Sequence, residues 1–202
     1  MQSGELEFRR IYADFQPRIL RYMGRMVGER EAEDLTQEVF VKVNRALDGF
    51  RGESSLSTWL YRIATNAALD RRRSPSFRRS TPRELADEAG EMGDEAESGR
   101  GEARAGERAP SAEEQLVRKE MNECIRDYVE KLPDNYRTTL VLSELEGLKD
   151  GEIAEILGVS LETVKIRLHR ARAKLKRELM LHCDAVWVED NEFLPDLRCV
   201  LE

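Results

Sequence analysis

Apolar residues recur at helical spacing along most of this chain, and the pattern predicts consecutive helices with almost no strands. The clearest case lies between residues 150 and 176, where an apolar-faced segment, a glycine and a longer basic segment follow one another. Gly158 stands where the chain must turn, and it tolerates the positive φ that a tight turn requires. Ser160 is well suited to cap the helix that follows. We therefore predict two helices joined by a tight turn.

The second of these helices combines one apolar stripe with a basic face. The stripe consists of Leu161, Val164, Leu168, Ala171 and Leu175. This arrangement is typical of a DNA-binding helix-turn-helix, whose second helix enters the major groove. The alternative is an ordinary pair of helices with a charged solvent face. The glycine turn, a small alanine in the first helix and the basic second helix together favour DNA binding.

The N-terminal third, about residues 6–73, also reads as consecutive helices. Pro17 should bend or divide the first of them, and Gly28 is a plausible end. Glu31 to Leu47 is predicted as a helix with one apolar stripe and an opposite face that carries carboxylates, amides and an apolar Val41. Such a face is usually only solvated, but an apolar residue among carboxylates and amides is also suited to docking a partner.

The segment from Thr58 to Arg73 predicts a helix that ends in three consecutive arginines. Aromatic rings, an amide and guanidinium groups are what single-stranded DNA recognition needs, because they stack on bases, read a base edge and hold phosphates. Tyr61, Arg62 and Asn66 are expected on the surface. In the alternative interpretation the aromatics are core residues and the arginines complement the helix dipole; for Trp59 the core position is favoured.

Charge is distributed in blocks along the 202 residues, of which 36% are charged and 6% aromatic, with a net charge of −7. We divide the chain into a helical domain at 1–76, a flexible acidic linker at 77–112, a second helical domain at 113–181 and an acidic, apolar extension at 182–202. The predicted fold class is all-α. No apolar run reaches the roughly 20 residues that span a bilayer, and no signal sequence is evident, so we expect a cytoplasmic protein.

The extension beyond residue 181 allows two interpretations. The candidates for a metal or thiol-sensing site are His182, Cys183 and Cys199, with Cys124 as a possible fourth ligand. However, His182 and Cys183 are neighbours in the sequence, which is unlike the ligand spacing of a closed zinc site. A docking segment that covers apolar surface is favoured, so we expect no metal and no cofactor. An enzyme is disfavoured, because there are only two histidines, no phosphate-binding loop and no nucleophile with a partnered base.

Four stretches of the chain occur in an order and spacing that together are specific for one protein family. They are EAEDLTQEVFVKVNRAL, STWLYRIATNAALDRRR, LPDNYRTTLVLSELEGL and the helix-turn-helix. The chain resembles an extracytoplasmic-function (ECF) sigma factor of bacterial RNA polymerase. The resemblance implies sigma region 2 in the first domain and sigma region 4 in the second, and leaves out the linker and the extension. It implies promoter recognition and opening, and no catalysis.

The resemblance also implies roles for particular residues. On the first domain, the residues expected to bind the clamp coiled coil of the largest polymerase subunit are Asp34, Gln37, Glu38, Val41 and Asn44. Those expected to bind the minus-ten element are Trp59, Tyr61, Arg62, Asn66, Asp70, Arg71, Arg72 and Arg73. Those expected to bind the minus-thirty-five element are Ser160, Glu162, Thr163, Lys165, Ile166, Arg167, His169 and Arg170.

The expected partners are core RNA polymerase, promoter DNA and an anti-sigma factor. We expect the protein to be held inactive by that anti-sigma factor or by its own C-terminal extension, residues 182–202. A stand-alone helix-turn-helix regulator is the alternative function. It requires a dimerisation surface for paired half-sites, and the sequence shows no extended heptad that would supply one.

Overall fold

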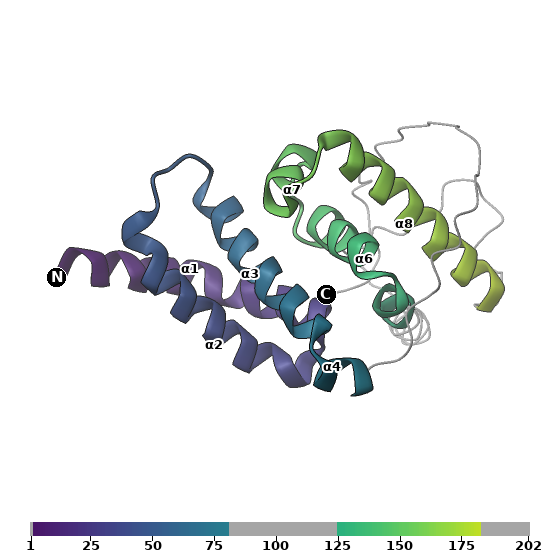
Figure 1. Ribbon diagram of the computed structural model, residues 1–202, viewed down its shortest axis with the longest axis horizontal. Coiled ribbons are helices and arrows are strands. Elements are labelled where there is room, and N and C mark those ends of the chain that lie inside the picture. The colour runs from purple at the N-terminus through teal and green to yellow at the C-terminus, as the bar shows by residue number, and fades with distance from the viewer. Residues whose placement is uncertain (1, 81–124, 183–202) are drawn as a thin grey trace, which may run out of the picture.

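The computed structural model describes residues 2–80 and 125–182, and every regular element in these two ranges is helical (Figure 1). The prediction of an all-α fold is therefore confirmed for this part of the chain. The first range contains α1 Gln2–Val27, α2 Glu29–Ala46, the short 3-10 helix η1 Leu47–Gly49, α3 Leu56–Arg73 and α4 Pro75–Ser80. The second contains helical residues 125–131, α6 Asp134–Leu140, the π-helical segment η2 Val141–Leu145, α7 Asp150–Leu157 and α8 Leu161–His182.

A single glycine separates α1 from α2. Gly28 has φ 84° and ψ 156°, a conformation that is open to glycine and strained for other residues, and the chain turns there. Helix α2 then packs along α1, with the rings of Tyr12 and Phe40 edge to face at 4.8 Å. The predicted stop at Gly28 is confirmed. Pro17 lies inside α1 and does not divide it.

Helix α3 completes the first domain and begins at a well-formed cap. The side chain of Ser55 accepts a hydrogen bond from the backbone N–H of Thr58 at 3.0 Å, which satisfies a free donor of the first turn. Inside the domain, the hydroxyls of Tyr22 and Thr65 form a buried hydrogen bond of 2.8 Å that joins α1 to α3. Burial raises the pKa of Tyr22, so this phenol stays protonated.

Helix α4 continues past residue 76, although the linker was predicted to begin at residue 77. Phe77 is buried, with the guanidinium carbons of Arg71 and Arg72 at 6.0 and 5.4 Å from its ring centroid. The predicted acidic linker otherwise falls on residues 81–112, outside the described residues.

The second domain is organised around a buried arginine. The guanidinium of Arg137, 1% exposed, donates to the backbone carbonyls of Val129 at 2.9 Å and Leu132 at 3.1 Å. These carbonyls lie where the helix of residues 125–131 ends and its last oxygens lack intrahelical donors. Arg137 therefore fixes the approach of α6 to that helix. The predicted start of α6 at Asp134 is confirmed.

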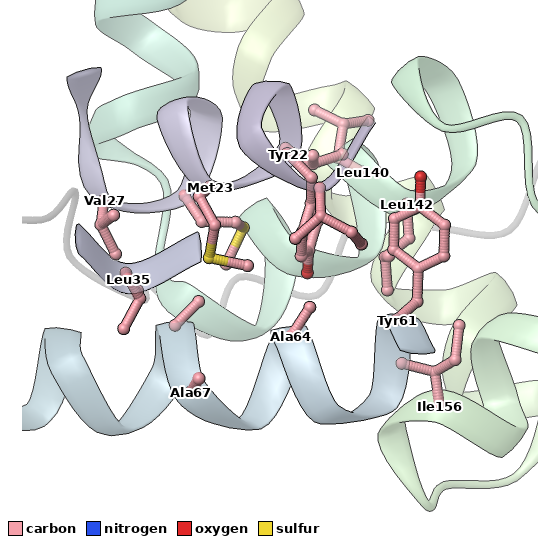
Figure 2. Packing of buried hydrophobic residues seen from close by; sticks show 14 of the residues in the cluster. Tyr22, Met23, Val27, Leu35, Tyr61, Ala64, Ala67, Leu140, Leu142 and Ile156 are labelled. Carbon is pink, nitrogen blue, oxygen red and sulfur yellow. The ribbon is translucent and has the colours of Figure 1, made fainter. Parts of the chain in front are cut away.

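The two domains pack directly against each other through α3 and α7 (Figure 1). Their buried side chains form one continuous cluster, and Figure 2 shows Tyr61 of α3 beside Leu142 and Ile156 of the second domain. The exposed surface of α3 is consequently smaller than its own sequence pattern predicts.

Candidate functional site

The helix-turn-helix has the geometry that its sequence predicts. Gly158 adopts the left-handed conformation, with φ 64° and ψ 37°, and the N–H of Val159 reaches back to the carbonyl of Ala154 at 3.1 Å. Ser160 caps α8, because its hydroxyl accepts from the backbone N–H of Thr163 at 3.1 Å. The turn therefore fixes the angle between α7 and α8 by backbone hydrogen bonds.

Helix α8 buries one stripe and exposes the predicted DNA-reading face. Val164, Leu168, Ala171 and Leu175 are buried, as expected. Leu161 was predicted in the stripe, and this is wrong: it is 47% exposed, and burial along α8 begins one turn later at Val164. Of the eight residues predicted to meet the minus-thirty-five element, Thr163 and Arg167 are half-buried, and six are exposed: Ser160, Glu162, Lys165, Ile166, His169 and Arg170.

The predicted polymerase-binding face lies along α2. All five of its residues are exposed: Asp34, Gln37, Glu38, Val41 and Asn44. They face away from the core because the opposite stripe of the helix, which includes Leu35, Val39 and Val43, is buried against α1 and α3. Val41 stands out as a 49% exposed β-branched side chain among carboxylates and amides. The arrangement presents an apolar centre with a polar rim, as many protein interfaces do.

The eight predicted minus-ten residues on α3 lie in different surroundings. Asn66, Asp70 and Arg73 are exposed and available to a ligand. Trp59 is half-buried against the core, with its ring 5.0 Å from that of Phe50, which agrees with the core position favoured for it.

Arg71 is held inside the first domain. Its guanidinium binds both carboxylate oxygens of Glu31, at 2.5 and 2.6 Å, in a bidentate pair that joins α3 to α2. This pairing lowers the pKa of Glu31. The contact gives Arg71 a structural role in the free protein.

The remaining three predicted minus-ten residues face the second domain. Tyr61 is 0% exposed and its hydroxyl donates to Glu146, and Arg62 binds Glu155 at 2.9 Å. Arg72 is 5% exposed, pairs with Asp134 and donates to the carbonyl of Met26 at 3.2 Å. The prediction that Tyr61 lies on the surface is therefore wrong for this structure, because α7 covers that side of α3. Burial beside the Glu146 carboxylate also raises the pKa of Tyr61, so its hydroxyl remains a donor.

Sequence reasoning missed the acidic residues at this contact. Asp134 begins α6, Glu155 lies in α7 and Glu146 lies in the bend after η2. Nothing in their local spacing marks these residues as partners of α3. Only a residue's position on the paired surfaces distinguishes these carboxylates from the many solvated ones.

The candidate metal ligands lie outside the part of the chain whose side chains are described: Cys124, Cys183, Cys199 and the side chain of His182. Within residues 2–80 and 125–182, the structure contains no cluster of three metal-ligating side chains. In the same ranges, none of the helices combines the length and the apolar character that crossing a membrane requires.

Comparison with known proteins connects both domains to one family. The model for sigma-70 region 2 matches residues 11–78, and that for sigma-70 region 4 matches residues 122–175. The ECF RNA polymerase sigma factor SigW of Bacillus subtilis is 36% identical over 166 residues, which cover 82% of this chain and 84% of the relative. The ECF RNA polymerase sigma-E factor of Escherichia coli K12 is 31% identical over 185 residues, covering 89% and 90%.

Two solved structures share the fold. The sigma factor RpoE from Bartonella quintana, in complex with the anti-sigma factor NepR, superposes with a TM-score of 0.60 at 20% identity, covering 87% of this chain and 98% of that one. CnrH, in complex with the cytosolic domain of CnrY, gives 0.58 at 24% identity, covering 90% and 94%. With both sigma regions matched in order and relatives above 30% identity over most of the chain, the protein belongs to the ECF family of RNA polymerase sigma factors.

Proposed function

We propose that this sigma factor binds core RNA polymerase through α2, opens promoters through α3 and reads the upstream element through α8. The observation that supports this most directly is that two separate exposed faces, on α2 and on α8, coincide with the residues that the family resemblance assigns to polymerase and to DNA. The protein acts as a dissociable specificity subunit without catalysis of its own, in the cytoplasm where polymerase works. Its net charge of −7 disfavours tight binding to free DNA, so promoter binding depends on the polymerase.

On α2, Val41 provides the apolar centre of the polymerase contact. Its side chain is 49% exposed, and the acids and amides around it are free to pair with polar groups of the clamp coiled coil. Replacing Val41 by Asp would place a charge at this centre and should weaken core binding strongly. Ala13→Asp adds the same charge to an exposed position of α1 and should leave core binding unchanged, as measured by fluorescence anisotropy with purified core polymerase.

On α3, the exposed Asn66 is the proposed reader of an extruded minus-ten base. Flipping a base out of the stack costs a few kcal/mol, which a hydrogen-bonding pocket must offset. Asn66→Ala should therefore reduce promoter opening more than core binding, measured by permanganate reactivity and by anisotropy. Asn135→Ala removes an exposed amide in the second domain and should change neither. An equal loss of opening and core binding would remove Asn66 from the base-reading role.

On α8, the exposed Ile166 and Arg170 are the proposed contacts with the major groove. An exposed Ile suits a thymine methyl group, and an exposed Arg suits a guanine or a phosphate. An anti-sigma factor is the further proposed partner, in keeping with the similar sigma factor RpoE, which was solved in complex with the anti-sigma factor NepR. The polypeptide that co-purifies with the protein would identify it.

Run-off transcription with purified core polymerase tests the function as a whole. Adding the protein should produce promoter-specific transcripts that core polymerase alone does not make. The alternative, a stand-alone helix-turn-helix regulator, predicts tight duplex binding by the isolated protein at physiological ionic strength. No gain in specific transcript, together with such binding, would replace the sigma-factor function by the alternative.

A further inference from the structure

Helix α8 carries more positive charge than its own domain neutralises. Its 22 residues include seven lysines and arginines and two glutamates, which gives the helix a formal charge of +5. Glu144 of η2 forms an ion pair with Arg172. Four further cations have no carboxylate partner among the residues that the structure describes: Lys165, Arg167, Arg170 and Lys176. The helix therefore presents a basic surface that is open to an anionic ligand.

The surface of α8 also includes exposed apolar side chains. Leu161 is 47% exposed and Leu181 is 67% exposed, and neither is among the proposed DNA contacts. Leu161 lies four residues before Lys165, and Ile166 lies four residues before Arg170. Residues at this spacing are neighbours on a helix, so each of these apolar side chains lies beside a cation. Such a surface suits a ligand that combines apolar groups with negative charge.

The segment that follows α8 in the sequence has this composition. Residues 183–202, the C-terminal segment, lie outside the described residues and contain six aspartates and glutamates and one arginine, a formal charge of −5. This charge is equal and opposite to that of α8. Large apolar residues are interspersed with the acids: Val186, Trp187, Val188, Phe193, Leu194, Leu197, Val200 and Leu201. The C-terminal segment can therefore supply carboxylates for the cations of α8 and apolar cover for its exposed leucines.

The covalent connection brings the C-terminal segment to α8. The segment begins directly after His182, where the helix ends. At 1.5 Å per residue α8 is about 33 Å long, whereas 20 residues of extended chain reach up to about 66 Å. The segment is therefore long enough to return along the whole helix. A short tether also gives an effective concentration of millimolar order, so contacts of modest affinity suffice to hold the segment there.

The outer face of α8 is separate from the contact between the two domains. Helix α8 packs against α6 and α7, and it lies on the side of the second domain that faces away from α1 and α2 (Figure 1). The contact with α3 is made mainly by α7. A ligand can therefore bind to the outer face of α8 without any change in the packing of the domains.

From the charge, the exposed leucines and the length of chain we infer that residues 183–202 bind the exposed face of α8 in the same chain and compete there with promoter DNA. Cationic side chains pair with carboxylates and with phosphates in the same way, so the two ligands exclude each other from Lys165 and Arg170. This inference rests on the proposed role of α8 in reading DNA. It adds the surface that the C-terminal segment covers.

The first test compares two charge variants of the full chain without polymerase. The segment variant combines four substitutions: Glu189→Gln, Asp190→Asn, Glu192→Gln and Asp196→Asn. The control variant makes the same change of net charge in the predicted linker: Asp87→Asn, Glu88→Gln, Glu91→Gln and Asp94→Asn. Fluorescence anisotropy measures binding of a fluorescein-labelled, mixed-sequence DNA duplex at physiological ionic strength, and circular dichroism checks that the helices persist.

We expect the segment variant to bind the duplex at least fivefold more tightly than the wild type, and the control variant to match the wild type. A fivefold gain corresponds to a C-terminal segment that occupies α8 in about four-fifths of wild-type molecules. Leu161→Gln should also raise the affinity for the duplex, because it removes an apolar contact of the segment from an exposed position that is not a proposed DNA contact.

Photocrosslinking locates the C-terminal segment directly. Phe193→p-benzoylphenylalanine introduces a photoreactive group into the segment, and mass spectrometry of the tryptic fragments identifies the residues that react with it. We expect crosslinks to α8 within a single chain. An excess of the DNA duplex should suppress them, because it competes for the same face.

The outcomes separate this inference from the proposed function. Equal gains in the segment and control variants would show that only net charge matters, and an unchanged affinity in the segment variant would show no competition; either result would overturn the inference. Crosslinks to other elements, or only between two chains, would also overturn it. Absence of promoter-specific transcripts with core polymerase would instead overturn the proposed function, and the crosslinking pattern does not depend on that result.

Discussion

Three glycines in three backbone conformations allow a direct test of the turns that shape this protein. Gly28, between α1 and α2, has φ 84° and ψ 156°, Gly158 has φ 64° and ψ 37°, and Gly24 lies within α1. A Cβ built on any of the three meets no packing neighbour within 4 Å. Replacement by alanine therefore changes stability through the backbone and not through a steric clash.

The expected free-energy changes follow from these conformations. An L-residue in the left-handed helical region costs about 1–2 kcal/mol, partly offset by the lower entropy of the unfolded alanine chain, so Gly158→Ala should destabilise by about 1 kcal/mol. The region occupied by Gly28 is essentially restricted to glycine, so Gly28→Ala should cost about 3 kcal/mol. Gly24→Ala removes a glycine from a helix and should stabilise by about 0.5–1 kcal/mol.

Urea unfolding followed by circular dichroism at 222 nm measures the series. With an unchanged m-value, each free-energy change appears as a shift of the midpoint. The midpoints should fall in the order Gly24→Ala, wild type, Gly158→Ala and Gly28→Ala. A Gly28→Ala variant that is as stable as Gly158→Ala would refute the argument, because it would mean that the junction of α1 and α2 does not need the glycine-only conformation.

Three other substitutions test the core, a cap and an ion pair. Leu60→Ala at a 0% exposed position should cost about 2–5 kcal/mol in thermal unfolding, whereas Leu60→Met should cost less than about 1.5 kcal/mol. Ser160→Ala removes the cap on the N–H of Thr163 and should cost about 1 kcal/mol, whereas Ser160→Gly should cost only about a few tenths of a kcal/mol; equal losses would contradict the cap. Because pairing with Arg71 lowers the pKa of Glu31, its contribution is complete above the ordinary glutamate pKa and is lost as pH falls through the lowered value. The stability difference between wild type and Glu31→Gln should therefore close in acid, and a difference that grows there would contradict the pairing.

The local elements of this protein could be predicted from sequence because their signals are local. Helical periodicity marked the buried stripes of α2 and α8, and Ser160 and Gly158 marked the cap and the turn of the helix-turn-helix. The exposed faces followed as the opposite sides of the same helices. Each of these signals depends on residues within about two turns of one another.

The short helix α4 and the uninterrupted course of α1 through Pro17 were not predicted. In helix α4, Phe77 packs against Arg71 and Arg72 at the end of α3. This is a contact between two elements, so the local sequence pattern does not indicate it. Pro17 is accommodated within a helix that tertiary packing supports on both sides of it, which propensity alone does not take into account.

From local sequence patterns alone we could predict the long helices, the turn between α7 and α8, and the faces that α2 and α8 turn away from their own domains. The covering of α3 on a second side, where Tyr61 is buried and Arg72 meets Asp134, became visible only in the folded chain. Periodicity could not indicate this contact, because it reports the face that a helix buries within its own domain. A tyrosine or an arginine has an apolar body and a polar end, so it suits water, DNA or another domain equally, and the packing of α7 selects among them.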